Sequence, residues 1–229
     1  MPMIRAVLFD LFGTLVESGS MSDRESVSHQ VAAELCVDGQ AFAELVRSTF
    51  DSRMKGELGG LTDTYVELAR RLGGSPQPKQ VDRAIEIRLN FSRQLLGDTS
   101  AAPVLDHLRS VGFRLGVVSD CSIETPTIWD ATWLSSLLDA ISFSCQLGVR
   151  KPHPEMYLEA TRTLGVSPGE CLYVGDGGSH ELSGAKALGM HAVLVADPRE
   201  DGRERPDEEI DWTGDRISSL SEISSLLGI

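Results

Sequence analysis

Hydrophobic residues follow two different spacings in the first hundred positions of the chain. Residues 4–9 (IRAVLF) form a short, nearly continuous apolar run rich in β-forming residues, which is typical of a buried strand. From residue 17 to residue 96 the apolar residues instead recur every three to four positions, as in Val27, Val31 and Leu35. We therefore expect one strand followed by a bundle of at least four helices.

Beyond residue 96, short apolar runs alternate with amphipathic segments, as expected for a parallel sheet covered by helices on both faces. The first strand most simply belongs to the same sheet, so that the helical stretch is an insertion. Residues 197–215, which are strongly acidic, are expected to form a surface loop. The predicted strands are 114–119, 140–144, 171–175 and 192–195, and the predicted helices 103–111, 128–138, 155–164 and 181–188.

Polar side chains follow four of the predicted strands. Asp10 follows the first strand, Ser119 and Asp120 end the second, Lys151 lies beyond the third, and Asp176 follows the strand CLYVG. Ligands of open parallel sheets bind beyond the carboxyl ends of the strands. We therefore expect these five residues to meet at one edge of the sheet.

Asp10 and Asp176 are suited to holding Mg²⁺, which prefers oxygen ligands in octahedral geometry. The ion would orient a phosphoryl group and cancel its negative charge while Asp10 attacks in line to form an aspartyl-phosphate. A phosphate-handling site explains why carboxylates, a hydroxyl and an ammonium group would gather at one place.

The remaining polar groups at this edge would bind the phosphate. Ser119 and Thr14 would donate hydrogen bonds to its oxygens, together with backbone N–H groups around Gly13 and Asp120. Lys151 would balance the charge of both the nucleophile and the phosphate.

Composition limits the choice of partners. Of the 229 residues, 21 are Lys or Arg and 34 are Asp or Glu, so that the net charge is −13. This acidity argues against binding nucleic acids or anionic membranes. The N-terminus lacks a signal-peptide core and no apolar run is long enough for a membrane span, so we expect a cytoplasmic protein with a small-molecule substrate. The sequence lacks the GxxxxGK[ST] loop of P-loop kinases, the GxGxxG dinucleotide motif, the GxSxG motif of serine hydrolases and the HExxH motif of zinc proteases.

Four motifs occur in order along the chain: FDLFGTL (9–15), VVSD (117–120), VRKPHPEMY (149–157) and YVGDGGSHELSGA (173–185). Through these motifs the chain resembles the haloacid dehalogenase superfamily of hydrolases, in the subgroup with a helical cap inserted after the first strand. The resemblance implies a Rossmann-like, doubly wound parallel-sheet core at residues 1–16 and 97–229 and a helical cap at residues 17–96.

The resemblance also implies roles for the matching residues. Asp10 would be the nucleophile, Thr14 and Ser119 would contact the anionic group of the substrate, and Lys151 would stabilise the nucleophile.

The same resemblance implies a Mg²⁺ site made by the Asp10 and Asp176 side chains and the backbone carbonyl of Phe12. Gly175 and Glu181 would support that site, with Glu181 at the position of a second acid.

Phe12 is a departure from most phosphatases of this superfamily, which have a second Asp at this position. That Asp protonates the leaving oxygen and later activates water, and general acid–base help of this kind is worth roughly 10²–10⁴ in rate. The haloacid dehalogenases themselves carry an aromatic residue at this position and work without metal. They bind the substrate carboxylate with an arginine of the cap, and Arg47 is the candidate for that arginine in this chain. The acidic Asp176 instead favours a metal-dependent phosphatase.

Three hypotheses therefore remain: a Mg²⁺-dependent hydrolase of a small phosphorylated metabolite, a metal-independent 2-haloacid dehalogenase, and a weakly catalytic phosphometabolite-binding protein. A phosphatase without the second Asp could act on acyl phosphates, or could use His153 or His180 as the proton carrier. The sequence identifies neither the substrate nor the oligomeric state.

Overall fold

The computed structural model of the chain describes residues 3–196, 209 and 211–229. A six-stranded sheet with the order β3-β2-β1-β4-β5-β6 forms the centre of the molecule. All neighbouring strands are parallel, which confirms the predicted α/β fold. The first strand lies in the middle of the sheet because β2 and β4 pair with its two edges. The strands are β1 (Ala6–Phe9), β2 (Arg114–Ser119), β3 (Ala140–Phe143), β4 (Cys171–Gly175), β5 (His191–Val195) and β6 (Asp215–Ile217).

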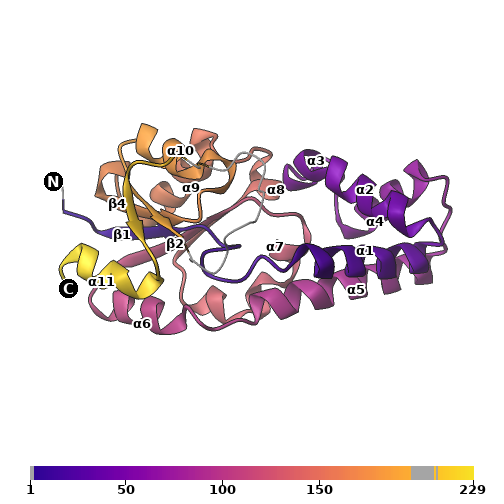
Figure 1. Cartoon of the computed structure of the whole chain (residues 1–229), viewed down its shortest axis with the longest axis horizontal. Helices are drawn as coiled ribbons and strands as arrows, with labels where there is room; N and C mark the ends of the chain where they lie inside the picture. Colours follow the sequence, from indigo (N-terminus) through magenta and orange to yellow (C-terminus); the bar gives the residue numbers. More distant parts are fainter. Residues whose placement is uncertain (1–2, 197–208, 210) are drawn as a thin grey trace.

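Helices cover both faces of the sheet (Figure 1). Successive strand residues point to opposite faces, so each face contributes alternate apolar side chains to its own core. One core packs against α6 (Ala102–Ser110) and α11 (Ile223–Leu227). The other packs against α9 (Pro154–Leu164) and α10 (Glu181–Ala187). The two-faced burial explains why the central strands read as continuous apolar runs.

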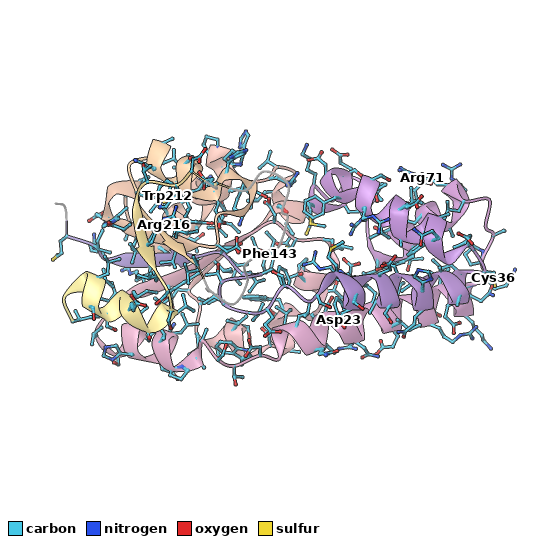
Figure 2. All side chains as sticks on the ribbon, viewed as in Figure 1. Asp23, Cys36, Arg71, Phe143, Trp212 and Arg216 are labelled. Carbon is cyan, nitrogen blue, oxygen red and sulfur yellow. The ribbon has the colours of Figure 1, made fainter. Side chains whose placement is uncertain are left out.

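Five helices lie between β1 and α6 in the sequence and project from one end of the core (Figure 1). We call them the inserted helices. They have a third hydrophobic core of their own, which includes Leu35, Phe42 and Leu68. Cys36 and Arg71 mark the end of this unit that lies farthest from the sheet (Figure 2). The inserted helices are α1 (Met21–Leu35), α2 (Gly39–Ser48), α3 (Phe50–Met54), α4 (Leu61–Arg71) and α5 (Pro78–Leu96).

Most predicted elements agree with the structure within two residues, but one does not. The helical segment expected at 128–138 begins earlier, as α7 (Glu124–Ile128), and continues as two short 3₁₀ turns. The short helices α8 (Ser144–Leu147) and α11 were not predicted. Of the loop expected at 197–215, residues 197–208 and 210 lie outside the described residues, and Asp215 opens the unpredicted edge strand β6.

Strand register aligns the ends of the central strands. Phe9 of β1 is level with Val117 of β2 and Val174 of β4. Because all three strands run in the same direction, the residues that follow them leave the sheet at the same edge. This register is what brings Asp10, Ser119 and Asp176 into one region.

Candidate active site

Asp10 is held at the end of β1 by both its backbone and its side chain. Its N–H donates to the carbonyl of Val174 at 2.9 Å. Its carboxylate is only 5% exposed and accepts a hydrogen bond from Lys151 Nζ on Oδ1 at 2.5 Å. The other oxygen, Oδ2, accepts a longer bond of 3.4 Å from the Thr14 hydroxyl. Asp10 is therefore fixed in orientation with one oxygen only weakly engaged.

Lys151 joins two buried carboxylates. Its ammonium group donates to Asp10 and also to Glu181 Oε2, at 2.6 Å. Its backbone N–H donates to Asp120 Oδ1 at 2.9 Å, which fixes the start of the side chain as well as its end. The position predicted from the VRKP motif is thus beside the predicted nucleophile.

Glu181 lies at the start of α10 and is completely buried. Besides Lys151, it accepts bonds from the Tyr173 hydroxyl and from the Gly177 N–H, both at 2.9 Å. Gly175 leaves room for this carboxylate, because a Cβ at that position would lie 2.1 Å from Glu181 Oε1. Both Glu181 oxygens already accept hydrogen bonds from protein donors, so this residue supports the site by holding Lys151 in place.

Three acidic side chains gather closely enough to hold a cation. One ligand oxygen from each of Asp10, Asp176 and Glu181 lies within 4.8 Å of the other two. Since the Glu181 oxygens are engaged, Asp10 and Asp176 are the pair best placed to reach an ion. Asp176 is oriented by a bond of 3.0 Å from the Gly178 N–H to its Oδ1.

Among the residues that the structure describes, acidic groups outnumber basic ones in this cluster. Three carboxylates lie near the ammonium group of Lys151, and these four groups together carry a net charge of −2 when all are ionised. Burial raises the pKa of Asp10 to about 6, with a further increase from Asp176, although Lys151 opposes the shift. Burial likewise raises the pKa of Glu181. A hard divalent cation with oxygen ligands fits both the donor set and the missing charge.

Ser119 ends β2 and Asp120 follows it, and their side chains lie in opposite environments. The Ser119 hydroxyl is fully buried and has no hydrogen-bond partner among the described residues. Asp120 is instead engaged on both oxygens, by the Lys151 N–H and by Arg150 Nε at 3.3 Å. The N–H of Gly13 donates to the Val16 carbonyl at 2.7 Å, within the turn after β1. Of these groups, the Ser119 hydroxyl is the one left with unused hydrogen-bonding capacity.

A protein-family model described as haloacid dehalogenase-like hydrolase matches residues 4–189, which span all of these positions. The chain belongs to this family. It is therefore a hydrolase, as the resemblance of its motifs predicted.

Relatives of this hydrolase include enzymes with both chemistries considered above. It is 30% identical to a glyceraldehyde 3-phosphate phosphatase of Methanopyrus kandleri, over 97% of this chain and 99% of that protein. It is 26% identical to (S)-2-haloacid dehalogenase 4A of Burkholderia cepacia, over 98% of this chain and 95% of that one. The crystal structure of 2-haloacid dehalogenase from Pseudomonas syringae pv. Tomato DC3000 covers 99% of both chains with a TM-score of 0.71 at 21% identity, a likeness of fold alone.

Phe12 of this haloacid dehalogenase-like hydrolase is half-buried and packs against the core cluster that lies on the α6 side of the sheet. Its backbone forms an isolated bridge with Val16. The side chain is thus part of the hydrophobic packing at the base of the inserted helices.

The other candidates for acid–base or carboxylate binding are solvent-exposed. His153 caps the N-terminus of α9, where its Nδ1 accepts a hydrogen bond from the Glu155 N–H at 3.2 Å, and both His153 and His180, which precedes α10, are exposed. Arg47 is exposed on α2. The exposure of Arg47 weakens the argument for this residue as the carboxylate ligand of a dehalogenase.

Sequence reasoning missed two residues of the site in this hydrolase. Tyr173 was interpreted only as part of an apolar strand, although its hydroxyl orients Glu181. Arg150 was passed over as the neighbour of Lys151, although it bonds with Asp120. A basic residue next to Lys151 in the VRKP motif was the available signal for Arg150, whereas nothing in the sequence marked Tyr173.

Proposed function

We propose that this chain hydrolyses a small phosphorylated metabolite through an aspartyl-phosphate on Asp10. The observation that carries the proposal is the buried position of Asp10, 2.5 Å from Lys151 Nζ and within 4.8 Å of an oxygen of Asp176. A carboxylate that faces an ammonium group and a second acid is suited to attack a dianion once a cation is present.

The proposed architecture has a core of residues 1–16 and 97–229 and a cap of residues 17–96. The separate hydrophobic core of the inserted helices and their place beyond the carboxyl ends of the strands support this division. A cap of this kind would exclude water and select the substrate.

The proposed cofactor is Mg²⁺, held by Asp10, Asp176 and the backbone carbonyl of Phe12. When bound, the ion would cancel phosphate charge and orient the phosphoryl group. The net charge of −2 in the cluster and its oxygen-only ligand set support this choice.

In the proposed reaction, an Asp10 carboxylate oxygen forms a bond to phosphorus while the bond from phosphorus to the leaving oxygen breaks. Ser119 and Thr14 donate to the phosphoryl oxygens, and Lys151 keeps Asp10 oriented. Water then attacks phosphorus and breaks the acyl-phosphate linkage, which releases inorganic phosphate and restores Asp10. With phenylalanine at position 12, leaving groups that need little protonation, such as those of acyl phosphates, are favoured.

Dehalogenation is the second candidate, because Phe12 and the dehalogenase among the relatives both favour it. In that reaction Asp10 would displace halide from carbon, and the halide needs no proton. The metal-suited placement of Asp176 and the phosphatase among the relatives favour phosphate hydrolysis instead.

The test is a panel of phosphate monoesters, acyl phosphates and 2-haloacids, each measured with Mg²⁺ and with EDTA. We expect Mg²⁺-dependent phosphate release that is lost in Asp10→Asn and retained in Asp130→Asn, a matched change of an exposed acid. Metal-independent halide release would support the dehalogenase. Absence of both products from a folded wild-type protein that binds phosphorylated metabolites in calorimetry would leave the binding protein as the explanation.

A further inference from the structure

Arg150 connects three parts of the chain that are far apart in sequence. Its side chain is only 16% exposed. Nε donates to Asp120 Oδ2 at 3.3 Å, Nη1 donates to Asp51 Oδ1 at 2.9 Å, and Nη2 donates to the Ser179 hydroxyl at 3.3 Å. The guanidinium group also lies over the Phe50 ring, 4.8 Å from its centroid. We call these five residues the Arg150 cluster.

On the core side, the partners of Arg150 belong to the loops that position the site. Asp120 holds the backbone N–H of Lys151 at 2.9 Å and follows Ser119 directly. Ser179 lies between Asp176 and Glu181. A shift of the Arg150 side chain would therefore release a hydrogen bond in two of the loops that carry the proposed catalytic groups.

On the other side, the partners belong to α3 in the inserted helices. Phe50 begins this helix and Asp51 follows it, and both residues are exposed. The chain just after α3 also approaches the core closely, since a Cβ on Gly56 would lie 2.2 Å from the carbonyl oxygen of Cys145 in α8. The inserted helices thus touch the core beside the loops of the site.

We propose that Arg150 is a positioning residue that couples the seating of α3 on the core to the alignment of the Asp120 and Ser179 loops. With α3 seated, Phe50 and Asp51 hold the guanidinium group where it bonds both loops. When α3 moves away from the core, Arg150 loses its stacking partner Phe50 and the carboxylate of Asp51. The hydrogen bond from the Lys151 N–H to Asp120 then weakens.

Arginine is the residue type that this role needs. Its planar group can stack on a ring and donate in several directions at once, which an ammonium group cannot do. Since a cation–π contact and an ion pair to the exposed carboxylate of Asp51 are each weak, the contact between α3 and the core remains reversible. The contact is therefore suited to a cap that must open for substrate and close for reaction.

The test changes only the α3 side, in the double variant Phe50→Ala/Asp51→Asn. Its first readout is hydrogen exchange of the Lys151 N–H, which bonds with Asp120 and lies on a different element from the substitutions. We expect this exchange to become about fivefold faster in the unliganded protein. If only the exchange of N–H groups within α3 changed, the proposal would be overturned, because Phe50 and Asp51 would then stabilise α3 alone.

The matched control is Lys55→Met. Lys55 is the other partner of Asp51, at 2.7 Å, and does not contact Arg150 in any hydrogen bond or ion pair among the described residues. We expect this variant to leave Lys151 exchange unchanged. An effect as large as that of the double variant would show that general loosening of α3 is sufficient, which contradicts a specific role of Arg150.

Kinetics give a second readout that rests on the proposed function. With a chromogenic phosphate ester, the double variant should raise KM about fivefold, and Arg150→Lys should reproduce most of that effect despite keeping the charge. Full function in Arg150→Lys would contradict the stacking and multiple donation proposed here. The exchange measurement needs no turnover, so a protein without phosphatase activity would refute the proposed function and leave this inference to be decided by Lys151 exchange.

Discussion

Ser119 and Ser142 provide a comparison at the level of single residues. Both hydroxyls are buried and lack a hydrogen-bond partner among the described residues, and both belong to neighbouring strands. Of the two, only Ser119 ends its strand, at the sheet edge where Asp10 follows β1. An unsatisfied buried hydroxyl is costly unless a ligand uses it, so the two serines should respond differently to substrate.

We predict that Ser119→Ala lowers kcat/KM for phosphate esters by about 10–100-fold because it removes a donor to the phosphoryl group. Its thermal stability should be equal to or above that of the wild type, since no protein hydrogen bond is lost. Ser142→Ala is the control and should keep full activity. Equal activity of both variants in steady-state assays would contradict the proposed role of Ser119.

Phe12 gives the second prediction at this level. Phe12→Asp should raise phosphatase kcat by about 100-fold if the missing acid limits turnover. It should also lower stability by about 1–2 kcal/mol, since the ring is half-buried against the core. The measurement is kcat in the presence of Mg²⁺. The control is Phe12→Asn, because asparagine is similar in size to aspartate but cannot transfer a proton.

An equal gain in Phe12→Asn would show that space, not proton transfer, limits the wild type. An unchanged or lower rate in a folded, Mg²⁺-binding Phe12→Asp variant would contradict the account of the missing acid.

The positions of the polar residues at the strand ends could be predicted from sequence, because residues that follow parallel strands all lie at the same edge of the sheet. What Glu181 does could not be inferred this way. Its role depends on Tyr173, on the Gly177 N–H and on the absence of a Cβ at Gly175, which only the packed structure brings together. Arg150 is similar, since its partners come from three distant segments.

At the level of elements, a buried network joins the inserted helices to α7. Glu124 at the start of α7 accepts the Tyr65 hydroxyl of α4 at 2.5 Å and pairs with Arg88 of α5 at 3.5 Å. Burial alone would raise the pKa of Glu124, but Arg88 and the hydroxyls of Ser122 and Tyr65 bring it down to about 2. The ionised form of Glu124 therefore stabilises the contact between the two units.

We predict that Glu124→Gln lowers the free energy of unfolding at pH 7 by about 3 kcal/mol, because it removes the buried charge that pairs with the partly buried Arg88. A pKa lowered by folding adds stability above the unfolded value of 4.5, which is lost as the pH falls towards 2. The difference between wild type and variant should therefore shrink between pH 5 and pH 3 in urea titrations.

Glu67→Gln is the control for this prediction. Hydrogen bonds from Arg70 and Arg71 also lower the Glu67 pKa to about 2, but this group lies at the surface of α4. Its substitution should change stability little, since exposed ion pairs contribute little. Equal destabilisation by the two variants would contradict the importance of burial at Glu124.

Among the elements, long periodic helices and central strands were predictable, whereas β6 and α8 were not. β6 has three residues, of which only Ile217 is buried, so it has no apolar run. α8 has four residues and follows β3 without a break. Such short elements form through contacts with their neighbours, and their sequences carry too few positions to show a period.

For the whole molecule, the principal electrostatic feature is an excess of negative charge, in the chain as a whole and at the candidate active site. The chain carries a net charge of −13, and among the described residues the carboxylates of Asp10, Asp176 and Glu181 lie close together beside Lys151. Among the described residues, no helix is both long and apolar enough to cross a membrane. A phosphorylated substrate would meet a repulsive field unless a cation is present at the site.

Mg²⁺ titration calorimetry on EDTA-treated, dialysed protein tests directly whether Asp10 and Asp176 together hold a divalent cation. We predict one saturable Mg²⁺ site in the wild type and in Asp130→Asn, and binding weakened by about tenfold or more in Asp176→Asn. Absence of binding to the folded wild type, or equal affinity in Asp176→Asn, would contradict the account.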